Sequence, residues 1–207
     1  MLGSFHEKYG PPGWFGLILG LAACSDNTVP LTYAPTIAVI PTGPPNVAGV
    51  SVVDQRGEDD PTWLGAIRGG FGNPMKVLHT PGPLSDTVAQ AFRDALKSRG
   101  LLAALGQGDV DLDVTIVKFE SDQYVRREAQ IRLTISLTRR STGRQIYRDD
   151  VATDLEKGSA VSFETGAFGS VEKLRLVNQA ALSQTIDEAV SRPGFLDAVR
   201  GGALPSA

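Results

Sequence analysis

Three segments in the second half of the chain alternate apolar and polar residues with a period of two, which is the pattern of half-buried β-strands. A turn at Ser141-Thr142-Gly143 precedes the last of them. The pattern predicts an antiparallel meander with one face packed and the other in water. The apolar positions are Val110, Leu112, Val114 and Ile116, then Ala129, Ile131, Leu133, Ile135 and Leu137, and then Ile146, Tyr147 and Val151.

Two segments with helical periodicity flank the meander. The first is predicted over 86–99, with Ser85 as its N-cap and Gly100 as the left-handed residue that ends it. The second follows Ser170 and is predicted over 171–190. The order of elements predicts an α+β fold: a two-layer sandwich of an antiparallel sheet with two long helices packed on one face.

A glycine-rich stretch lies between two short apolar segments, 63–68 and 76–79, which predicts a β-hairpin. Its consecutive glycine N–H groups could form an anion-binding nest, but the Gly-Lys-Ser/Thr ending of a phosphate loop is missing. We predict a flexible turn, and the alternative is a partner-binding loop with an exposed aromatic. The loop residues are Arg68, Gly69, Gly70, Phe71, Gly72 and Asn73.

The single cysteine of the chain, Cys24, ends a short apolar run over 14–23. The run has the length of a signal-peptide hydrophobic region and is too short to cross a bilayer of about 30 Å. Leu21-Ala22-Ala23-Cys24 resembles the bacterial lipobox, the recognition site of the lipoprotein signal peptidase. The resemblance implies a diacylglycerol thioether and an N-acyl chain on Cys24, and we expect no other cofactor. The alternative is a buried free cysteine after an apolar helix.

The residue after the cysteine bears on the membrane that carries the anchor. In many enteric bacteria an Asp at this position favours retention in the inner membrane, whereas this chain has Ser25. We therefore expect a lipid anchor in the outer membrane, with the domain facing the periplasm.

The lipobox and the proline content divide the chain into four parts. We predict a signal peptide over 1–23, a lipidated cysteine with a proline-rich tether over 24–46, a single α+β domain over 47–200 and a flexible tail over 201–207. Recurrent prolines exclude a helix in the tether and leave at most an edge strand over 36–40.

Composition excludes several classes of function. The net charge of −3 comes without a block of Lys or Arg, so we expect no nucleic-acid partner. An acylated Cys24 leaves no thiol for catalysis or disulfides. His79 is then the one histidine of the mature chain, and no Gly-x-Ser-x-Gly nucleophile motif occurs. We therefore predict that the protein is not an enzyme; the enzymatic alternative requires His79 beside a serine and a carboxylate in a cleft.

An acidic run, Asp109-x-Asp111-x-Asp113 with Glu120, superficially fits a calcium loop. Position six of that loop needs a glycine for its sharp turn, and here it is Val114. The intervening residues also alternate as in a strand. We predict a solvated strand face and no metal site.

Three polar residues have structural interpretations. Asp54 and Arg56 follow a predicted buried strand, and we expect them to pair or to brace the loop around residues 63–68, rather than to bind a ligand. Asn178 falls in the apolar stripe of the second helix, so we expect hydrogen-bond partners in the core.

Several short motifs carry a resemblance that covers most of the mature chain. They are the lipobox, the tether, Val52-Val53-Asp54-Gln55-Arg56, the helix before Arg99-Gly100, the meander and Leu176-Val177-Asn178-Gln179-Ala180-Ala181-Leu182. Together they resemble the YajG-like lipoproteins, a Gram-negative outer-membrane family. The layout is also similar to auxiliary lipoproteins of lipid-trafficking ABC transporters.

Neither family is known to be enzymatic, so the resemblance implies a binding or assembly module with an envelope protein partner. The alternative is an auxiliary subunit of a lipid-trafficking complex that holds an acyl chain between helices and sheet. An apolar groove of about 300 Å³ or more would favour this alternative.

Overall fold

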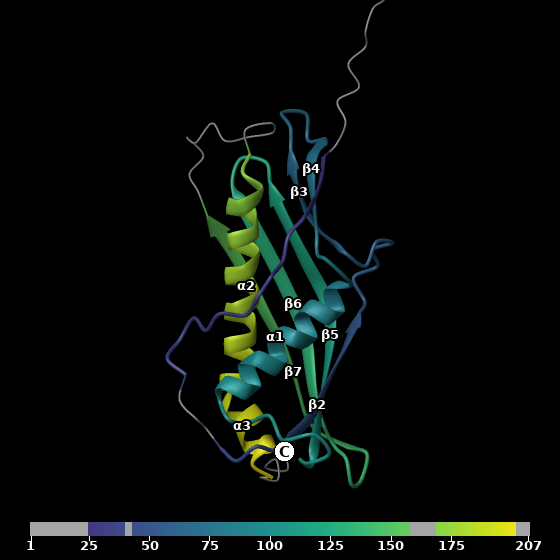
Figure 1. The fold of residues 1–207 in the computed structure, drawn as a ribbon, viewed down its shortest axis with the longest axis vertical. Helices are drawn as coiled ribbons and strands as arrows, with labels where there is room; N and C mark the ends of the chain where they lie inside the picture. Colours follow the sequence, from purple (N-terminus) through teal and green to yellow (C-terminus); the bar gives the residue numbers. More distant parts are fainter. Residues whose placement is uncertain (1–24, 40–42, 158–168, 202–207) are drawn as a thin grey trace, which may run out of the picture.

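A mixed β-sheet forms one layer of the protein and helices form the other (Figure 1). The computed structural model describes residues 25–39, 43–157 and 169–201. Within these residues the strands are β1 Ser25–Thr28, β2 Val47–Asp54, β3 Trp63–Arg68, β4 Pro74–His79, β5 Val110–Gln123, β6 Arg127–Arg139 and β7 Arg144–Lys157. The helices are α1 Leu84–Ser98, α2 Val171–Ser191 and α3 Pro193–Val199. The predicted α+β class is confirmed.

The strands are ordered β1-β4-β3-β5-β6-β7, and β2 also pairs with β5. The meander β5-β6-β7 is antiparallel, as predicted, and so is the β3–β4 hairpin. The prediction of a purely antiparallel sheet is wrong, because β1 runs parallel to β4, and both β2 and β3 run parallel to β5. Periodicity reports which face of a strand is buried but not the direction of its neighbour. The crossover through α1 makes the β2–β5 pairing possible.

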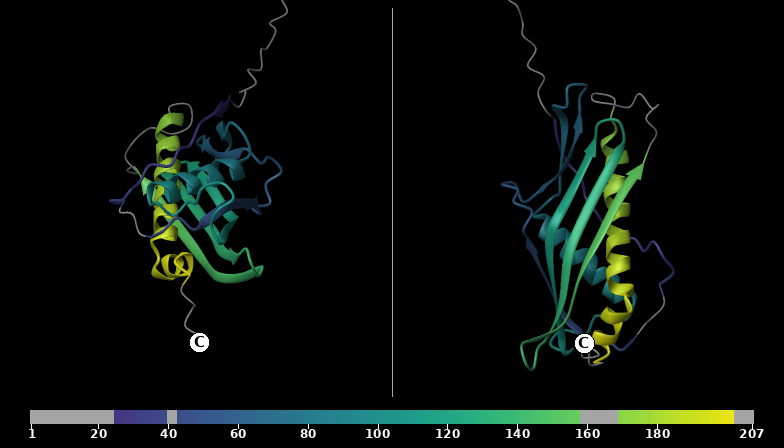
Figure 2. Two further views of the ribbon diagram at one scale, coloured as in Figure 1. Left: turned by 60° about the horizontal axis from the view of Figure 1, so that its bottom comes forward. Right: turned by 180° about the vertical axis from the view of Figure 1, so that it is seen from behind.

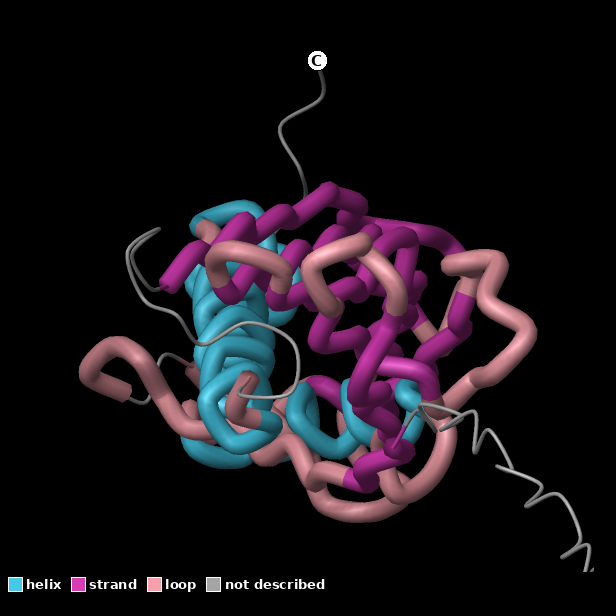
Figure 3. The backbone as a smooth tube through the Cα atoms, turned by 90° about the horizontal axis from the view of Figure 1, so that it is seen from above, coloured by secondary structure: helices cyan, strands magenta, loops and turns pink. Residues whose placement is uncertain are grey.

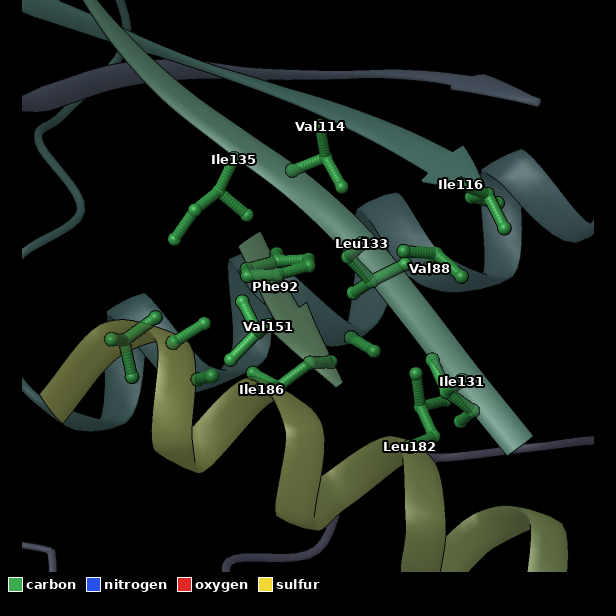
Figure 4. Packing of buried hydrophobic residues seen from close by; sticks show 14 of the residues in the cluster. Val88, Phe92, Val114, Ile116, Ile131, Leu133, Ile135, Val151, Leu182 and Ile186 are labelled. Atoms are coloured by element: carbon green, nitrogen blue, oxygen red, sulfur yellow. The ribbon is translucent and has the colours of Figure 1, made fainter. Parts of the chain in front are cut away.

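The hydrophobic core lies between the sheet and the helices α1 and α2. Both helices lie on the same side of the sheet, which is seen from its other side in the right panel of Figure 2 and from above in Figure 3. Phe92 of α1 and Ile186 of α2 lie among strand residues such as Leu133 and Val151 (Figure 4). All four side chains are buried, so the apolar stripes predicted from the sequence form this interface.

The helix ends agree only in part with the capping residues predicted from the sequence. Ser170 caps α2 by accepting a hydrogen bond from the backbone N–H of Lys173 at 3.2 Å. Gly100 has φ of 69°, the left-handed conformation that ends α1. The predicted cap at Ser85 is wrong, because α1 begins at Leu84, two residues earlier than predicted, and Pro83 occupies the N-cap without a side-chain hydrogen bond.

A short third helix, α3, follows α2 and was not predicted. Pro193 occupies its first turn, where the missing N–H has no cost. The proline that stops one helix therefore starts the next. Phe195 of α3 is buried and meets Tyr147 edge-on, with ring centroids 6.0 Å apart.

The proline-rich segment lies against the domain over residues 25–36, where the sequence predicted a tether. The backbone N–H of Val29 donates to the carbonyl of His79 at 2.8 Å, and both Val29 and Leu31 are buried in the core. The strand in this segment is β1, and no strand forms over residues 36–39. The folded unit therefore begins near Ser25 and not at residue 47.

A buried ion pair holds this segment in place. Asp187 of α2 and Arg99 are 2% and 3% exposed, and Arg99 Nη2 lies 2.6 Å from Asp187 Oδ1. The hydroxyl of Tyr33 donates to the same carboxylate oxygen, and the backbone N–H of Thr36 donates to the other at 2.6 Å. Burial alone would raise the pKa of Asp187, but hydrogen bonds from the hydroxyl and N–H of Thr36, from Tyr33 and from Arg99 outweigh it and hold that pKa below its usual range.

Some predictions fall on residues outside those described. These are the signal peptide over 1–23, the lipidated Cys24 and the tail beyond Gly201. In the part that the structure describes, no helix is both long and apolar enough to cross a bilayer.

Candidate functional site

The glycine-rich loop, predicted to be a flexible turn with partner binding as the alternative, forms the turn of the β3–β4 hairpin. The N–H of Gly69 donates to the carbonyl of Asn73 at 2.8 Å, and the N–H of Gly72 donates to the carbonyl of Gly69 at 2.9 Å. These two N–H groups are used within the turn, which argues against an anion nest. Gly72 has φ of 81°, a conformation that favours glycine. Phe71 is fully exposed at the end of the turn.

A second turn, between β5 and β6, lies beside the hairpin turn. The Tyr124 hydroxyl donates to the carbonyl of Gly70 at 2.8 Å and so joins the two turns. Tyr124 and its neighbour Val125 are each 44% exposed. We call Phe71, Tyr124 and Val125 the apolar tip.

A pocket of about 540 Å³ opens next to the apolar tip and is lined in part by Tyr124 and Val125. Three charged side chains of its lining, Arg68, Asp122 and Arg126, form ion pairs. Arg68 Nε donates to Asp122 Oδ1 at 2.7 Å, and Arg126 Nη1 donates to Glu156 Oε1 at 2.5 Å. The charges of these paired side chains therefore compensate one another locally.

Asp54 and Arg56 lie where β2 ends and β3 begins along the same edge of β5. The guanidinium of Arg56 contacts both carboxylate oxygens of Asp54, and its Nη1 donates to the carbonyls of Trp63 and Phe119 at 2.8 and 3.1 Å. Burial alone would raise the pKa of Asp54, but the hydrogen bonds from Arg56 lower it below its usual range. These hydrogen bonds of the Arg56 guanidinium all go to groups of the protein itself, which fits a structural brace.

Asn178 is fully buried and links α2 to the sheet. Its Nδ2 donates to Ser121 Oγ at 2.8 Å and to the carbonyl of Leu174 at 3.1 Å. Ser121 Oγ in turn donates to the carbonyl of Leu64 at 3.2 Å. Among the described residues Asn178 Oδ1 has no hydrogen-bond partner. A buried oxygen without a partner lowers the stability of the fold, whereas the hydrogen bond that Asn178 Nδ2 donates to Ser121 defines the position of α2 on the sheet.

His79 does not form a catalytic triad with the residues around it. Its Nδ1 lies 3.1 Å from both Asp60 Oδ2 and Thr62 Oγ1, so the carboxylate and the hydroxyl meet the same ring nitrogen. The Thr62 hydroxyl donates to Asp60, and Nε2 of the ring faces Asp26 at 3.8 Å. A triad needs the base between nucleophile and acid, bonded through its two nitrogens. This arrangement does not support hydrolytic chemistry.

The acidic run of β5 forms ion pairs and hydrogen bonds with its surroundings. Asp111 lies 3.5 Å from Arg140, and Asp113 accepts a hydrogen bond from Thr138 at 3.0 Å. No group of three His, Cys, Asp or Glu side chains suited to a metal ion occurs among the described residues. The run is a solvated strand face.

Two features, one at the apolar tip and one in the core, were missed from the sequence. Tyr124 and Val125 form an apolar pair at a turn, where polar residues are usual, and this could have drawn attention to them. Asp187 stands between the buried Ile186 and Ala189 of α2, and an acidic residue in an apolar stripe indicates a buried partner.

The described residues thus define an α+β domain with a packed core and an exposed apolar tip, without a recognisable catalytic constellation. The sequence matches no protein-family model and no curated protein. The fold is similar to that of protein XCC0632 from Xanthomonas campestris, of the family model DUF330, with a TM-score of 0.57 at 19% identity over 84% of this chain and 97% of that one. This likeness shows a shared fold.

Two further solved structures resemble the chain more distantly. The hypothetical protein CT253 from Chlamydia trachomatis has a TM-score of 0.47 at 11% identity, over 74% of this chain and 99% of that one. Lipoprotein GNA1162 from Neisseria meningitidis has a TM-score of 0.28 at 13% identity, over 68% of this chain and 97% of that one.

Proposed function

We propose that the protein is a non-enzymatic lipoprotein of the YajG-like kind, anchored in the outer membrane through Cys24, whose periplasmic domain is a binding or assembly module. One observation carries the proposal: Ser25, which directly follows the lipobox cysteine, is paired with Lys76 in the sheet. The folded domain thus begins one residue after the acylation site, so acyl chains on Cys24 would hold it directly against the membrane.

The apolar tip is the proposed binding surface. Exposed aromatic residues are common anchors of interfaces, since they bury a large area at low cost in side-chain entropy. Phe71 is not needed to form its turn, which is closed by backbone hydrogen bonds of Gly69 and Gly72. Its exposure is therefore better explained by binding than by folding.

The alternative, an auxiliary subunit that holds an acyl chain between helices and sheet, has less support. Buried side chains from α1, α2 and the sheet fill this interface as one contiguous cluster. A pocket of about 300 Å³ does exist, but it is lined by residues such as Val117, Arg132 and Thr134 of β5 and β6, away from α1 and α2. The apolar-groove criterion therefore does not favour this alternative.

The anchor is tested by Cys24→Ser. We expect this variant to remain an uncleaved precursor without lipid, because serine has no thiol to form the thioether. The measurement is incorporation of labelled palmitate in bacterial cells, with the wild-type chain as the positive control. Label in the Cys24→Ser variant at the wild-type level would contradict the lipoprotein assignment.

The binding surface is tested by a photocrosslinking residue at position 71 in intact envelopes. We expect crosslinks to an envelope component at this position and none from position 105, where Leu105 is equally exposed in the loop before β5. Phe71→Ser should change the free energy of unfolding by no more than about 0.5 kcal/mol, as surface substitutions usually do. A melting temperature far below that of the wild type would instead show that Phe71 stabilises the fold.

A further inference from the structure

The apolar tip and the start of the folded chain lie at the same end of the molecule. In the parallel pairing of β1 with β4, Ser25 is opposite Lys76, two residues from the beginning of β4 at the hairpin turn. The purple start of β1 lies next to the β3–β4 hairpin at the upper end of Figure 1. Tyr124 joins the second turn to the same end through its bond to Gly70.

Chain length limits how far the acylation site can lie from this end. Cys24 is bonded to Ser25, so its Cα is about 3.8 Å away. Even if the chain extended straight along β1, Cys24 would reach only the level of Met75. The hairpin extends further in the same direction. Pro74 lies two residues beyond Lys76, about 7 Å at the rise of a strand, and the turn that carries Phe71 lies beyond Pro74. The apolar tip therefore lies at least as far out as the lipidated cysteine.

The chemistry of the tip fits the interface of a bilayer. Phenylalanine and tyrosine sit well at this depth, because their rings are apolar and the tyrosine hydroxyl keeps a polar partner. The carbonyl of Gly70 is that partner for Tyr124. Arg68 and Arg126, which line the pocket beside the tip, are paired with carboxylates, so we expect the contact not to depend on attraction of these arginines to anionic lipid.

We propose that Phe71, Tyr124 and Val125 insert into the lipid surface that holds Cys24, so that the binding surface of the protein is the membrane itself. This inference rests on the proposed function, because it requires acylation of Cys24. The acyl chains provide attachment, and the three side chains fix the orientation of the domain. The long axis of β5 then points away from the membrane, and the loop before Val110 faces the periplasm.

The experiment uses the full chain, purified in its lipidated form, with Phe71→Cys or the matched control Leu105→Cys. An acylated Cys24 is a thioether, so the new cysteine is the only thiol and takes an environment-sensitive nitrobenzoxadiazole label. Leu105 is also fully exposed and lies at the opposite end of the 14-residue β5, roughly 40 Å away at the rise of a strand. Both labelled proteins are reconstituted into vesicles of phosphatidylethanolamine and phosphatidylglycerol.

We expect the label at position 71 to gain emission severalfold, to shift to the blue and to be quenched by spin-labelled lipid. The label at position 105 should behave as in water. Added salt should leave both results unchanged, because Arg68 and Arg126 beside the tip are already paired with carboxylates. If the protein stayed bound to the vesicles while the label at position 71 behaved as in water, the insertion alone would be overturned. A change at position 71 only after envelope protein is added would also overturn it, in favour of a protein partner. Protein that carries no lipid and stays in solution would overturn the proposed function as well.

Discussion

Asp187→Ala should lower the free energy of unfolding by about 3–5 kcal/mol, because it leaves Arg99 as a buried charge without its partner. Tyr33 and Thr36 lose their acceptor in the same substitution. We therefore expect the segment over residues 29–36 to detach from α2 before the rest of the domain unfolds. Denaturant unfolding measures the first effect, and amide hydrogen exchange of this segment measures the second.

A matched control is Glu156→Gln, which breaks an ion pair with Arg126 whose two side chains are about half exposed. This change should cost no more than about 1 kcal/mol. Equal losses in the two variants would show that the Arg99–Asp187 pair is not desolvated in solution.

The same carboxylate makes a defined contribution to the pH dependence of stability. The pKa of Asp187 is lower in the folded protein than in the unfolded chain, where it is about 3.9, so its contribution is fully present above that value. It is lost as the pH falls through the folded pKa. Asp187→Ala should therefore show a weaker fall in stability below about pH 4 than the wild type. An unchanged slope would contradict the lowered pKa.

Gly65→Ala should lower the free energy of unfolding by about 3 kcal/mol or more, because a methyl group has no room between β3 and β5. A Cβ on Gly65 would lie 2.1 Å from both the carbonyl oxygen and Oγ of Ser121. The strands would have to separate, and Ser121 would lose its bonds to Leu64 and Asn178. Thermal unfolding of the variant measures this loss.

Gly70→Ala provides the control in the same hairpin. A Cβ at this position meets no atom within 4 Å, and Gly70 does not have a positive φ. We expect a change of no more than about 0.5 kcal/mol. If Gly65→Ala were equally mild, β3 would not lie as close to β5 as the structure shows.

The candidate site could be predicted only where a local pattern carried it. Glycines between two short apolar segments predicted the hairpin turn and its exposed Phe71, because turn chemistry depends on adjacent residues. The contribution of Tyr124 was not predictable, since the pairing of β3 with β5 brings together turns that lie more than 50 residues apart. The arrangement of Ser25 beside this tip likewise depends on a parallel pairing that periodicity does not report.

The sequence by itself determined the elements that arise from local rules. Alternation over 110–151 specifies which strand faces are buried, and the apolar stripes specify which sides of α1 and α2 meet the sheet, because side-chain direction repeats every 2 or 3.6 residues. Only the tertiary structure decided the direction of β1, β2 and β3, and the closure of the proline-rich segment onto Asp187. The physical reason is that these features depend on hydrogen bonds and desolvated charges between residues as far apart as Tyr33 and Asp187, whose energies exist only once the chain has brought them together.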